Sequence, residues 1–281
     1  MGYRTVLLNL QDADRADEII SAGVRIAKEF GAHVIGLHVV PKVQYFYATA
    51  AIQVATEVFE AEQKFYDAQA EKIRAIFDRE MPGDLVSEWR RVEAGGPATS
   101  STIVEHAMCA DLVVTGQVDP ERGFEGDAGT AERLVMESGR PVLILPYAGK
   151  FKVIGQNVLA GWNGRRESVR AVFDALPLLK RAKSVRLMWA NPESENGGEG
   201  TGTPGSELAA TLSRHGVKVE TTHTVTRQIG IGDELLSRAA DQGADLMVMG
   251  AYGHSRVREY VFGGATRHIL KHMTVPVLMS H

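Results

Sequence analysis

The sequence has one cysteine, little excess of either charge, and no long hydrophobic run. A single Cys109 excludes an intrachain disulfide and a cysteine-based zinc site. The formal net charge of -4 argues against a general binder of nucleic acid or of anionic membranes. No apolar stretch approaches the roughly 20 residues that a membrane-spanning helix needs. With no signal peptide either, these features predict a cytoplasmic protein.

The sequence also lacks the motifs of common catalytic and metal centres. There is no GxxxxGK[ST] loop, no HExxH pair and no strand–GxSxG–helix context, so we assign no catalytic residue. His268 and His272 lie four apart on a predicted helix, but no third ligand is near them in sequence. We therefore expect no metal site and interpret these histidines as favoured by the helix dipole. Cys109, beside an apolar strand, is expected to be a buried packing residue rather than a nucleophile.

What the chain does contain is a pattern of strands and helices that occurs twice. ADLVVTG from Ala110 is repeated as ADLMVMG from Ala244, and RPVLIL from Arg140 as VPVLMS from Val275. Around these runs, short apolar strands alternate with helical patterns. The chain is therefore predicted to be a duplication with domains at 1–148 and 152–281.

Alternating strands and helices predict an α/β fold with parallel strands and helices on both faces of the sheet. We assume the strand order 3-2-1-4-5 in each domain, which periodicity alone does not give. Ligands of such sheets bind beyond the carboxyl ends of the strands, where the strand order reverses. In the second domain, that point lies between the loop at Trp162 to Arg165 and the loop at Gly250 to Gly253.

The stretch GAYGHSRVREYVFGGAT, from Gly250 to Thr266, has the parts of an anion site. An apolar strand leads into it, glycines flank a loop, and a helical pattern leads out. Amides of a first helical turn and the helix dipole favour negative charge, and glycine lets a phosphate approach the backbone. The working hypothesis is a loop that holds a phosphate chain. The alternative is a strand–loop–helix joint with glycines needed only for turns.

These residues resemble the universal stress protein family. The spacing Gly250-x2-Gly253-x9-Gly263 matches that family's glycine loop, VLAGWNG from Val158 resembles its first strand, and PVLMS from Pro276 its last. The resemblance covers the chain as a tandem pair. It implies two flavodoxin-like, or Rossmann-like, domains of the adenine nucleotide alpha hydrolase type, each with five parallel strands. It also implies that the final strands meet, as in a dimer, here as a pseudo-dimer within one chain.

In the ATP-binding branch of the family, the glycine loop holds the phosphates and an Asp after strand one meets the adenosine. Asn163 stands where that Asp is usual, and Gly264 where Ser or Thr usually follows the third glycine, so binding is expected to be weakened or altered rather than lost. Trp162 either stacks on a base or caps the core. The candidate nucleotide-binding residues are Trp162, Asn163, Gly250, Gly253, His254, Gly263, Gly264, Ala265 and Thr266.

The first domain departs much further from the family pattern. Gln11-Asp12 replaces Asn-Gly, Asp119 falls where the second glycine should be, and Pro120 stiffens the turn. Nearby carboxylates would repel phosphate. We interpret this domain as a structural partner that no longer binds nucleotide. The alternative is a site for something other than phosphate.

The leading hypothesis is a stress-response regulatory module that binds an adenine nucleotide, ATP with or without Mg²⁺, in its second domain. Hydrolysis would be slow at most, and bound nucleotide would bias a conformation or a surface for an unknown protein partner. The sequence does not distinguish ATP from ADP, AMP or a cyclic dinucleotide. A homodimer is a further option. The alternatives are a nucleotide-free protein-interaction module and, less favoured, an adenylating enzyme.

Overall fold

The structure is a computed structural model that describes most of the chain. The described residues are 2–42, 52–96, 98–119, 129–191, 205–226, 229–252 and 264–281, without the side chains of residues 52–59. The chain divides into two compact units, Tyr3–Ser138 and Gly139–His281. The predicted domain limits, 1–148 and 152–281, stay a prediction.

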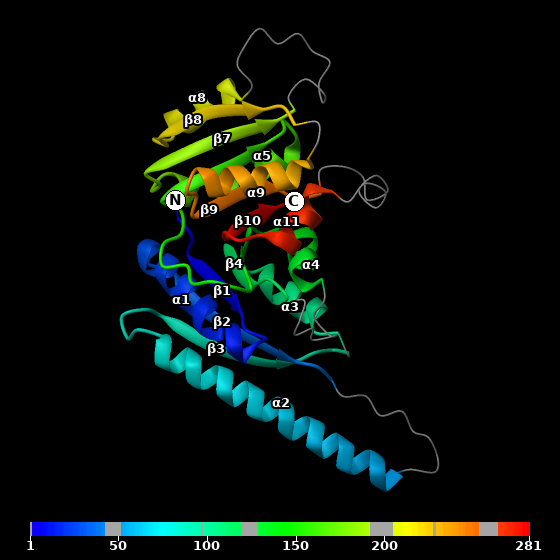
Figure 1. The fold of residues 1–281 in the computed structure, drawn as a ribbon. Coiled ribbons are helices and arrows are strands. Elements are labelled where there is room, and N and C mark those ends of the chain that lie inside the picture. The colour runs from blue at the N-terminus through cyan, green and yellow to red at the C-terminus, as the bar shows by residue number, and fades with distance from the viewer. Residues whose placement is uncertain are drawn as a thin grey trace. The chain divides into compact units, whose positions relative to one another are not determined.

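Strands and helices alternate along the described chain, as the hydrophobic pattern predicts (Figure 1). The strands are β1 Thr5–Asn9, β2 His33–Val40, β3 Ser87–Glu93, β4 Leu112–Gly116, β5 Val142–Leu145, β6 Asn157–Trp162, β7 Ser184–Ala190, β8 Val219–Thr224, β9 Leu246–Gly250 and β10 Val277–Ser280. The helices are α1 Ala13–Phe30, α2 Ile52–Glu80, α3 Ser100–Ala107, α4 Thr130–Glu137, α5 Arg166–Asp174, α6 Leu176–Leu179, α8 Ser206–Arg214, α9 Ile231–Asp241 and α11 Ala265–His272.

The strand order confirms the predicted topology. Along the mixed sheet the order is β3-β2-β1-β4-β5-β10-β9-β6-β7-β8, so each repeat reads 3-2-1-4-5. Within each repeat, the neighbouring strands whose residue pairing is described are parallel. Val6 of β1 pairs with Val34 of β2, and Val158 of β6 pairs with Val185 of β7. The final strands β5 and β10 pair antiparallel, with Leu143 opposite Leu278. The expected pairing of final strands within one chain is therefore confirmed.

The repeated Ala-Asp-Leu sequence has a structural reason in each repeat. Asp245 precedes β9, and its Oδ1 accepts from the amides of Gly155 at 2.7 Å and Gln156 at 2.9 Å. It also accepts from the amide of Asn157, where β6 begins. Asp111 accepts from two amides at the start of β1 in the same way. Each aspartate thus satisfies backbone donors that precede a central strand.

The ends of the helices follow from local sequence. Asp12 is the N-cap of α1, where its side chain accepts from the amide of Asp14 at 2.8 Å, and Gly31 ends the helix with a φ of 60°. In the second repeat, the spacing of apolar residues from Glu167 to Leu179 predicts one helix with a kink at Pro177. The structure instead has two helices, α5 and α6, with Pro177 in the first turn of α6. Proline fits a first turn because its missing N–H is not needed there.

The core lies between the helices and the central strands, whose apolar side chains are fully buried, as in Leu7 and Val113. The expectation that Cys109 is buried is wrong, because it is exposed in the turn after α3. Its position after the last helical turn, rather than on the apolar face of α3, explains the difference. Within the described ranges, no helix combines the length and the apolar character needed to cross a membrane.

Candidate functional site

The candidate site of the second repeat lies where the strand order reverses. β6 pairs with β7 on one side and with β9 on the other, all in parallel. The carboxyl ends of β6 and β9 lead to α5 and to the glycine-rich stretch before α11. Parallel strands end at the same edge of a sheet, so these two connections start side by side. Gly253, His254 and Gly263 lie outside the described residues, and their predicted roles stay predictions.

Gly250, the last residue of β9, is a glycine because α5 packs against it. A Cβ at this position would overlap the carbonyl carbon of Glu167 and lie 2.5 Å from the amide nitrogen of Ser168. Both are backbone atoms of the first turn of α5, so they cannot rotate away. This close approach of helix to strand accounts for the glycine without any ligand. The approach of a phosphate to Gly250 is therefore not needed to explain that residue.

The N-terminus of α11 is the part of the site best suited to an anion. Gly264 is its N-cap, has extended backbone angles (φ -55°, ψ 155°), and supplies no side-chain cap. The first helical bond runs from the amide of His268 to the carbonyl of Gly264 at 3.2 Å. The helix itself has no acceptor for the amides of its first turn, so these point out of its end. They carry the positive end of the helix dipole.

Thr266 ties the end of β9 to the start of α11. It is 3% exposed, and its Oγ1 accepts from the amide of Tyr252 at 3.2 Å. Tyr252 has a φ of 55°, a conformation that residues other than glycine rarely adopt. Because Gly264 lacks the hydroxyl that the family usually has after the third glycine, the sequence predicts that the nearby Thr266 supplies one from the next turn. In the structure the Thr266 oxygen already accepts a hydrogen bond within the chain.

Asn163 starts the helix on the other side of the site. Its Oδ1 accepts from the amide of Arg165 at 3.1 Å, next to Gly164, whose φ is 72°. The side-chain carbonyl of Asn163, at the position of the family's adenosine-binding Asp, therefore already accepts a hydrogen bond from within the chain. In the first turn of α5, the buried Glu167 pairs with Arg166 at 3.0 Å. Asn163 thus helps to orient the start of α5.

Trp162, at the end of β6, has an aromatic partner inside the protein. Its ring lies 6.5 Å from that of Trp189, with an interplanar angle of 86°. Both tryptophans are half-buried, and Gly205, before α8, has its Cα next to the Trp162 ring. The edge-to-face pair supports the interpretation of Trp162 as a cap of the core. Trp189 was not predicted. Its indole N–H is buried and has no acceptor among the described residues.

At the same place in the first repeat, polar side chains bridge the strand ends. The side-chain amide of Gln11 donates to Asn9 Oδ1 at 2.9 Å and to the carbonyl of Leu37 at 3.5 Å. Its Oε1 accepts from the amide of Val39 at 3.3 Å. The Asn9 amide donates to Thr115 Oγ1 at 3.0 Å. We call this the Gln11 network. It runs from β2 across β1 to β4, where the strand order of the first repeat reverses.

The second repeat has no residues that could form such a network. The strand registers equate Asn9 with Gly161, Thr115 with Met249 and Gln11 with Asn163. Gly161 and Met249 have no polar side chain, and the Asn163 side chain accepts from the amide of Arg165, just before α5. The two repeats therefore differ at their strand ends. In the first repeat, side chains of the chain itself form hydrogen bonds there, and in the second repeat the corresponding residues do not form this network. The sequence feature that could have indicated the Gln11 network is the presence of two amide residues, Asn9 and Gln11, directly after the apolar residues of β1.

The acidic loop of the first repeat is only partly described. Asp119, the residue in place of the second glycine, follows β4, while residues 120–128 lie outside the described residues. The expectation that its carboxylates repel phosphate stays a prediction.

The described residues contain no group of histidine, cysteine and carboxylate side chains that could hold a metal ion. His268 Nε2 instead pairs with Asp233 Oδ1 at 2.9 Å, and its ring lies 4.3 Å from that of His272. His272 contacts the carbonyl of His268 through Nδ1 at 2.9 Å. Both histidines thus take part in contacts between α9 and α11 or within α11.

Comparison with known proteins gives a family match over nearly the whole chain. The model of the universal stress protein family matches residues 2–146 and 156–281. Over 68 residues, the chain is 38% identical to universal stress protein Slr1230 of Synechocystis sp. (strain ATCC 27184 / PCC 6803 / Kazusa), a match over 24% of this chain. The chain thus spans only 22% of the length of that relative.

Solved structures share the fold over the whole chain. A universal stress protein of Archaeoglobus fulgidus is 17% identical, with a TM-score of 0.65 over 98% of this chain and 95% of that one. A putative universal stress protein of Pseudomonas aeruginosa is 14% identical, with a TM-score of 0.54 over 99% of this chain and 93% of that one. A universal stress protein has been solved in complex with cAMP, and the universal stress protein of Archaeoglobus fulgidus in complex with dAMP.

Proposed function

This chain belongs to the universal stress protein family as a tandem of two family domains, and we propose that its second repeat binds an adenine nucleotide. The preferred ligand is ATP, with or without Mg²⁺, and the bound nucleotide acts as a regulatory signal in a stress response. A cytoplasmic location is part of this proposal and follows from the cysteine content.

The observation that supports the proposal best is the N-terminus of α11. Its N-cap is Gly264, which has no side chain to satisfy the amides of the first turn. Helix dipole and outward-pointing amides together attract phosphate. The helix starts beside the ends of β6 and β9, where ligands of this fold bind. Homologues with bound adenine nucleotides agree with this choice of ligand.

The difference between the repeats supports a single nucleotide site. In the first repeat, the Gln11 network occupies polar groups of β1, β2 and β4 at the point of reversal. A nucleotide would have to displace these bonds and leave buried polar atoms unsatisfied. The second repeat has Gly161 and Met249 at the corresponding positions and loses no such bonds.

Turnover of the nucleotide is expected to be slow. The sequence lacks the lysine of a phosphate-binding GxxxxGK[ST] loop and a residue placed as a general base. A slowly hydrolysed nucleotide suits a regulatory role better than an enzymatic one. Bound nucleotide then acts by favouring one conformation or one partner surface.

Gly264→Asp tests the anion site without removing the helix. Aspartate is a preferred N-cap residue and the backbone of Gly264 is extended, so α11 should remain folded. Its carboxylate would repel phosphate, so the affinity for Mg-ATP in calorimetry should fall at least tenfold. Gly264→Asn is the matched control, because it caps equally well without a charge. Equal losses in both variants, with intact folding, would refute a charge-based site.

Two further measurements separate this proposal from a nucleotide-free interaction module. The purified protein is denatured and assayed for released adenine nucleotide, and the intact protein is titrated with ATP, ADP, AMP and cyclic nucleotides. If no adenine nucleotide is released and no heat of binding is seen at millimolar ligand, nucleotide binding is excluded. An adenylating enzyme would instead release pyrophosphate from ATP when a substrate is added.

A further inference from the structure

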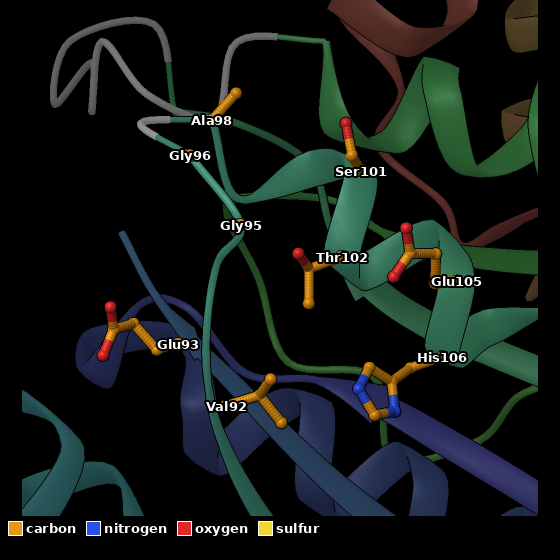
Figure 2. A pocket seen from close by; sticks show the side chains of 9 residues that line it. All are labelled: Val92, Glu93, Gly95, Gly96, Ala98, Ser101, Thr102, Glu105 and His106. Carbon is orange, nitrogen blue, oxygen red and sulfur yellow. The ribbon is translucent and has the colours of Figure 1, made fainter. Parts of the chain in front are cut away.

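The first repeat has a hollow between β3 and α3, away from the point where its strand order reverses. Its volume is about 450 Å³, within the range of roughly 300–1,000 Å³ of small-molecule sites. Val92, Thr102, Glu105 and His106 line it, with the backbone of Gly95 and Gly96 at one side. Figure 2 shows the Val92, Thr102 and His106 side chains between strand and helix, while Glu93 points away from the helix.

The second repeat has a bonded network at the corresponding positions. Glu234 of α9 accepts from Thr224 Oγ1 and from Arg238 Nε, both at 2.8 Å. Glu234 is 8% exposed, and these two bonds lower the pKa of its carboxyl, the bond from Arg238 having the larger effect. The side chain of Glu234 thereby spans the distance from helix to strand end. We call this the Glu234 network.

Register and burial equate these residues with the lining of the hollow. Val92 of β3 pairs with Val39 of β2, and Thr224 of β8 pairs with Ala190 of β7. Val92 and Thr224 therefore occupy corresponding positions. Along the two helices, Thr102 corresponds to Glu234 and His106 to Arg238, a match that also aligns the buried Ile103 with Leu235. Valine cannot donate a hydrogen bond, and threonine is too short to reach across. The hollow therefore exists because the first repeat lacks the Glu234 network.

The charges that face the hollow are mainly negative. Glu105 is exposed at its rim and, within the part of the chain that the structure describes, forms no ion pair. Arg90 and Arg133 are cations near the hollow, and each has a carboxylate partner. Arg90 pairs with Glu88. Arg133 donates to Ser101 at the wall at 3.2 Å and pairs with Glu137 at 2.8 Å. His106 Nδ1 lies 3.5 Å from Arg90. Burial lowers the pKa of His106, and Arg90 lowers it further against an opposing effect of Glu105, so both effects favour the neutral imidazole.

We propose that this hollow binds a small organic cation, with an amine or guanidinium group held by Glu105 and an aliphatic part against Val92. The Thr102 hydroxyl is a further acceptor at the wall. A positive group paired with Glu105 and a short carbon chain along Val92 together match the lining. The site is independent of the nucleotide site and gives the first repeat a ligand of opposite charge.

Agmatine, which carries a guanidinium and an amine on a short chain, is a suitable probe. Calorimetry with the full chain should detect binding with a dissociation constant of about 1 mM, as for a small and partly exposed site. Succinate, an anion of similar length, should not bind. Added salt should weaken the binding of agmatine by screening. Absence of heat with agmatine, or equal binding of both probes, would overturn the proposal.

Two variants test the residues. Glu105→Gln removes the charge of an exposed side chain and should weaken agmatine binding roughly tenfold while folding is unchanged. Ser237→Ala, at the corresponding position of α9, is the matched control and should have no effect. Full affinity in Glu105→Gln would exclude Glu105 as the anchor and overturn the proposal.

A transplant of the Glu234 network tests the hollow itself. The combined changes Val92→Thr, Thr102→Glu and His106→Arg should fill the space and abolish binding. If this variant unfolds, Thr102→Leu, which fills the hollow with an apolar side chain, serves instead. Retained agmatine binding in a folded variant with the hollow filled would show that the cation binds elsewhere.

Discussion

Replacing Gly250 by alanine tests whether contact between β9 and α5 is the reason for this glycine. The added methyl group would overlap the backbone of Glu167 and Ser168. Gly116 ends β4 at the corresponding position of the first repeat, and among the described residues a Cβ there would meet only the Ile19 side chain, at 3.4 Å. Neither glycine has a positive φ, so alanine fits both backbones. The pair therefore isolates the steric effect.

The expected magnitudes differ clearly. Added volume in a packed core typically costs about 1–3 kcal/mol, and a clash with backbone atoms is expected at the upper end, about 3 kcal/mol. Alanine also restricts the unfolded chain, which stabilises each variant by about 0.4–1 kcal/mol. Gly250→Ala should therefore lose about 2–3 kcal/mol. Gly116→Ala should lie near zero, because the end of the isoleucine side chain can move.

Urea unfolding monitored by tryptophan fluorescence can measure both. Trp89 lies in the first repeat, and Trp162 and Trp189 lie in the second, so a Trp89→Phe background reports on the second repeat alone. Gly250→Ala should shift the midpoint of this signal strongly to lower urea. A negligible shift, or an equal shift for Gly116→Ala in the background that retains only Trp89, would refute the packing argument.

Three further predictions concern hydrogen-bond networks. Asp245→Ala should destabilise the second repeat by about 3 kcal/mol in urea unfolding, because several amides before β6 lose a charged acceptor, and Asp241→Ala, on the exposed end of α9, should have little effect. Glu234 has a pKa below its usual value, so its contribution to stability is present above about pH 4.5 and is lost as the pH falls through the lowered pKa. Glu234→Gln should reduce this acid dependence of the unfolding midpoint, and an unchanged pH profile would argue against the network. Gln11→Ala should cost about 1–3 kcal/mol in the same unfolding assay, because Asn9 and the amide of Val39 lose their partners, whereas Gln11→Glu should restore only the bond from Val39.

The fold could be predicted from the sequence because its signals are local and repeated. Runs such as TVLLN in β1 and LMVMG in β9 are apolar on both faces, as strands covered by helices on both sides must be. Asp111 and Asp245 mark the starts of β4 and β9, and Gly31 marks a helix end. Pro177 was placed correctly as a disturbance. Its effect, two helices instead of a kinked one, depends on packing that the sequence pattern does not give.

The reasons for individual site residues were harder to predict. Gly250 has the spacing of a phosphate loop, but its missing side chain makes room for Glu167 and Ser168, which are more than eighty residues earlier. Asn163 has the position of a nucleotide ligand, yet its side chain accepts from the amide of Arg165, the residue before α5. Such roles depend on long-range contacts. A glycine spacing alone therefore does not separate a residue needed for binding from one needed for packing.

The duplication itself is the strongest guide to what each repeat can do. Among the described residues, each network is found in one repeat. At the corresponding place the first repeat has a hollow and the second has Gly161 and Met249. The Gln11 network fills the point of strand reversal in the first repeat, and the Glu234 network fills the space between strand edge and helix in the second. If both were mere packing differences, transplanting either one would change stability alone. Transplanting the Glu234 network into the first repeat should instead remove a ligand, and Gly161→Asn with Met249→Thr should weaken nucleotide binding in the second. If the folded variants are less stable but still bind both ligands, the repeats have diverged in packing and not in function.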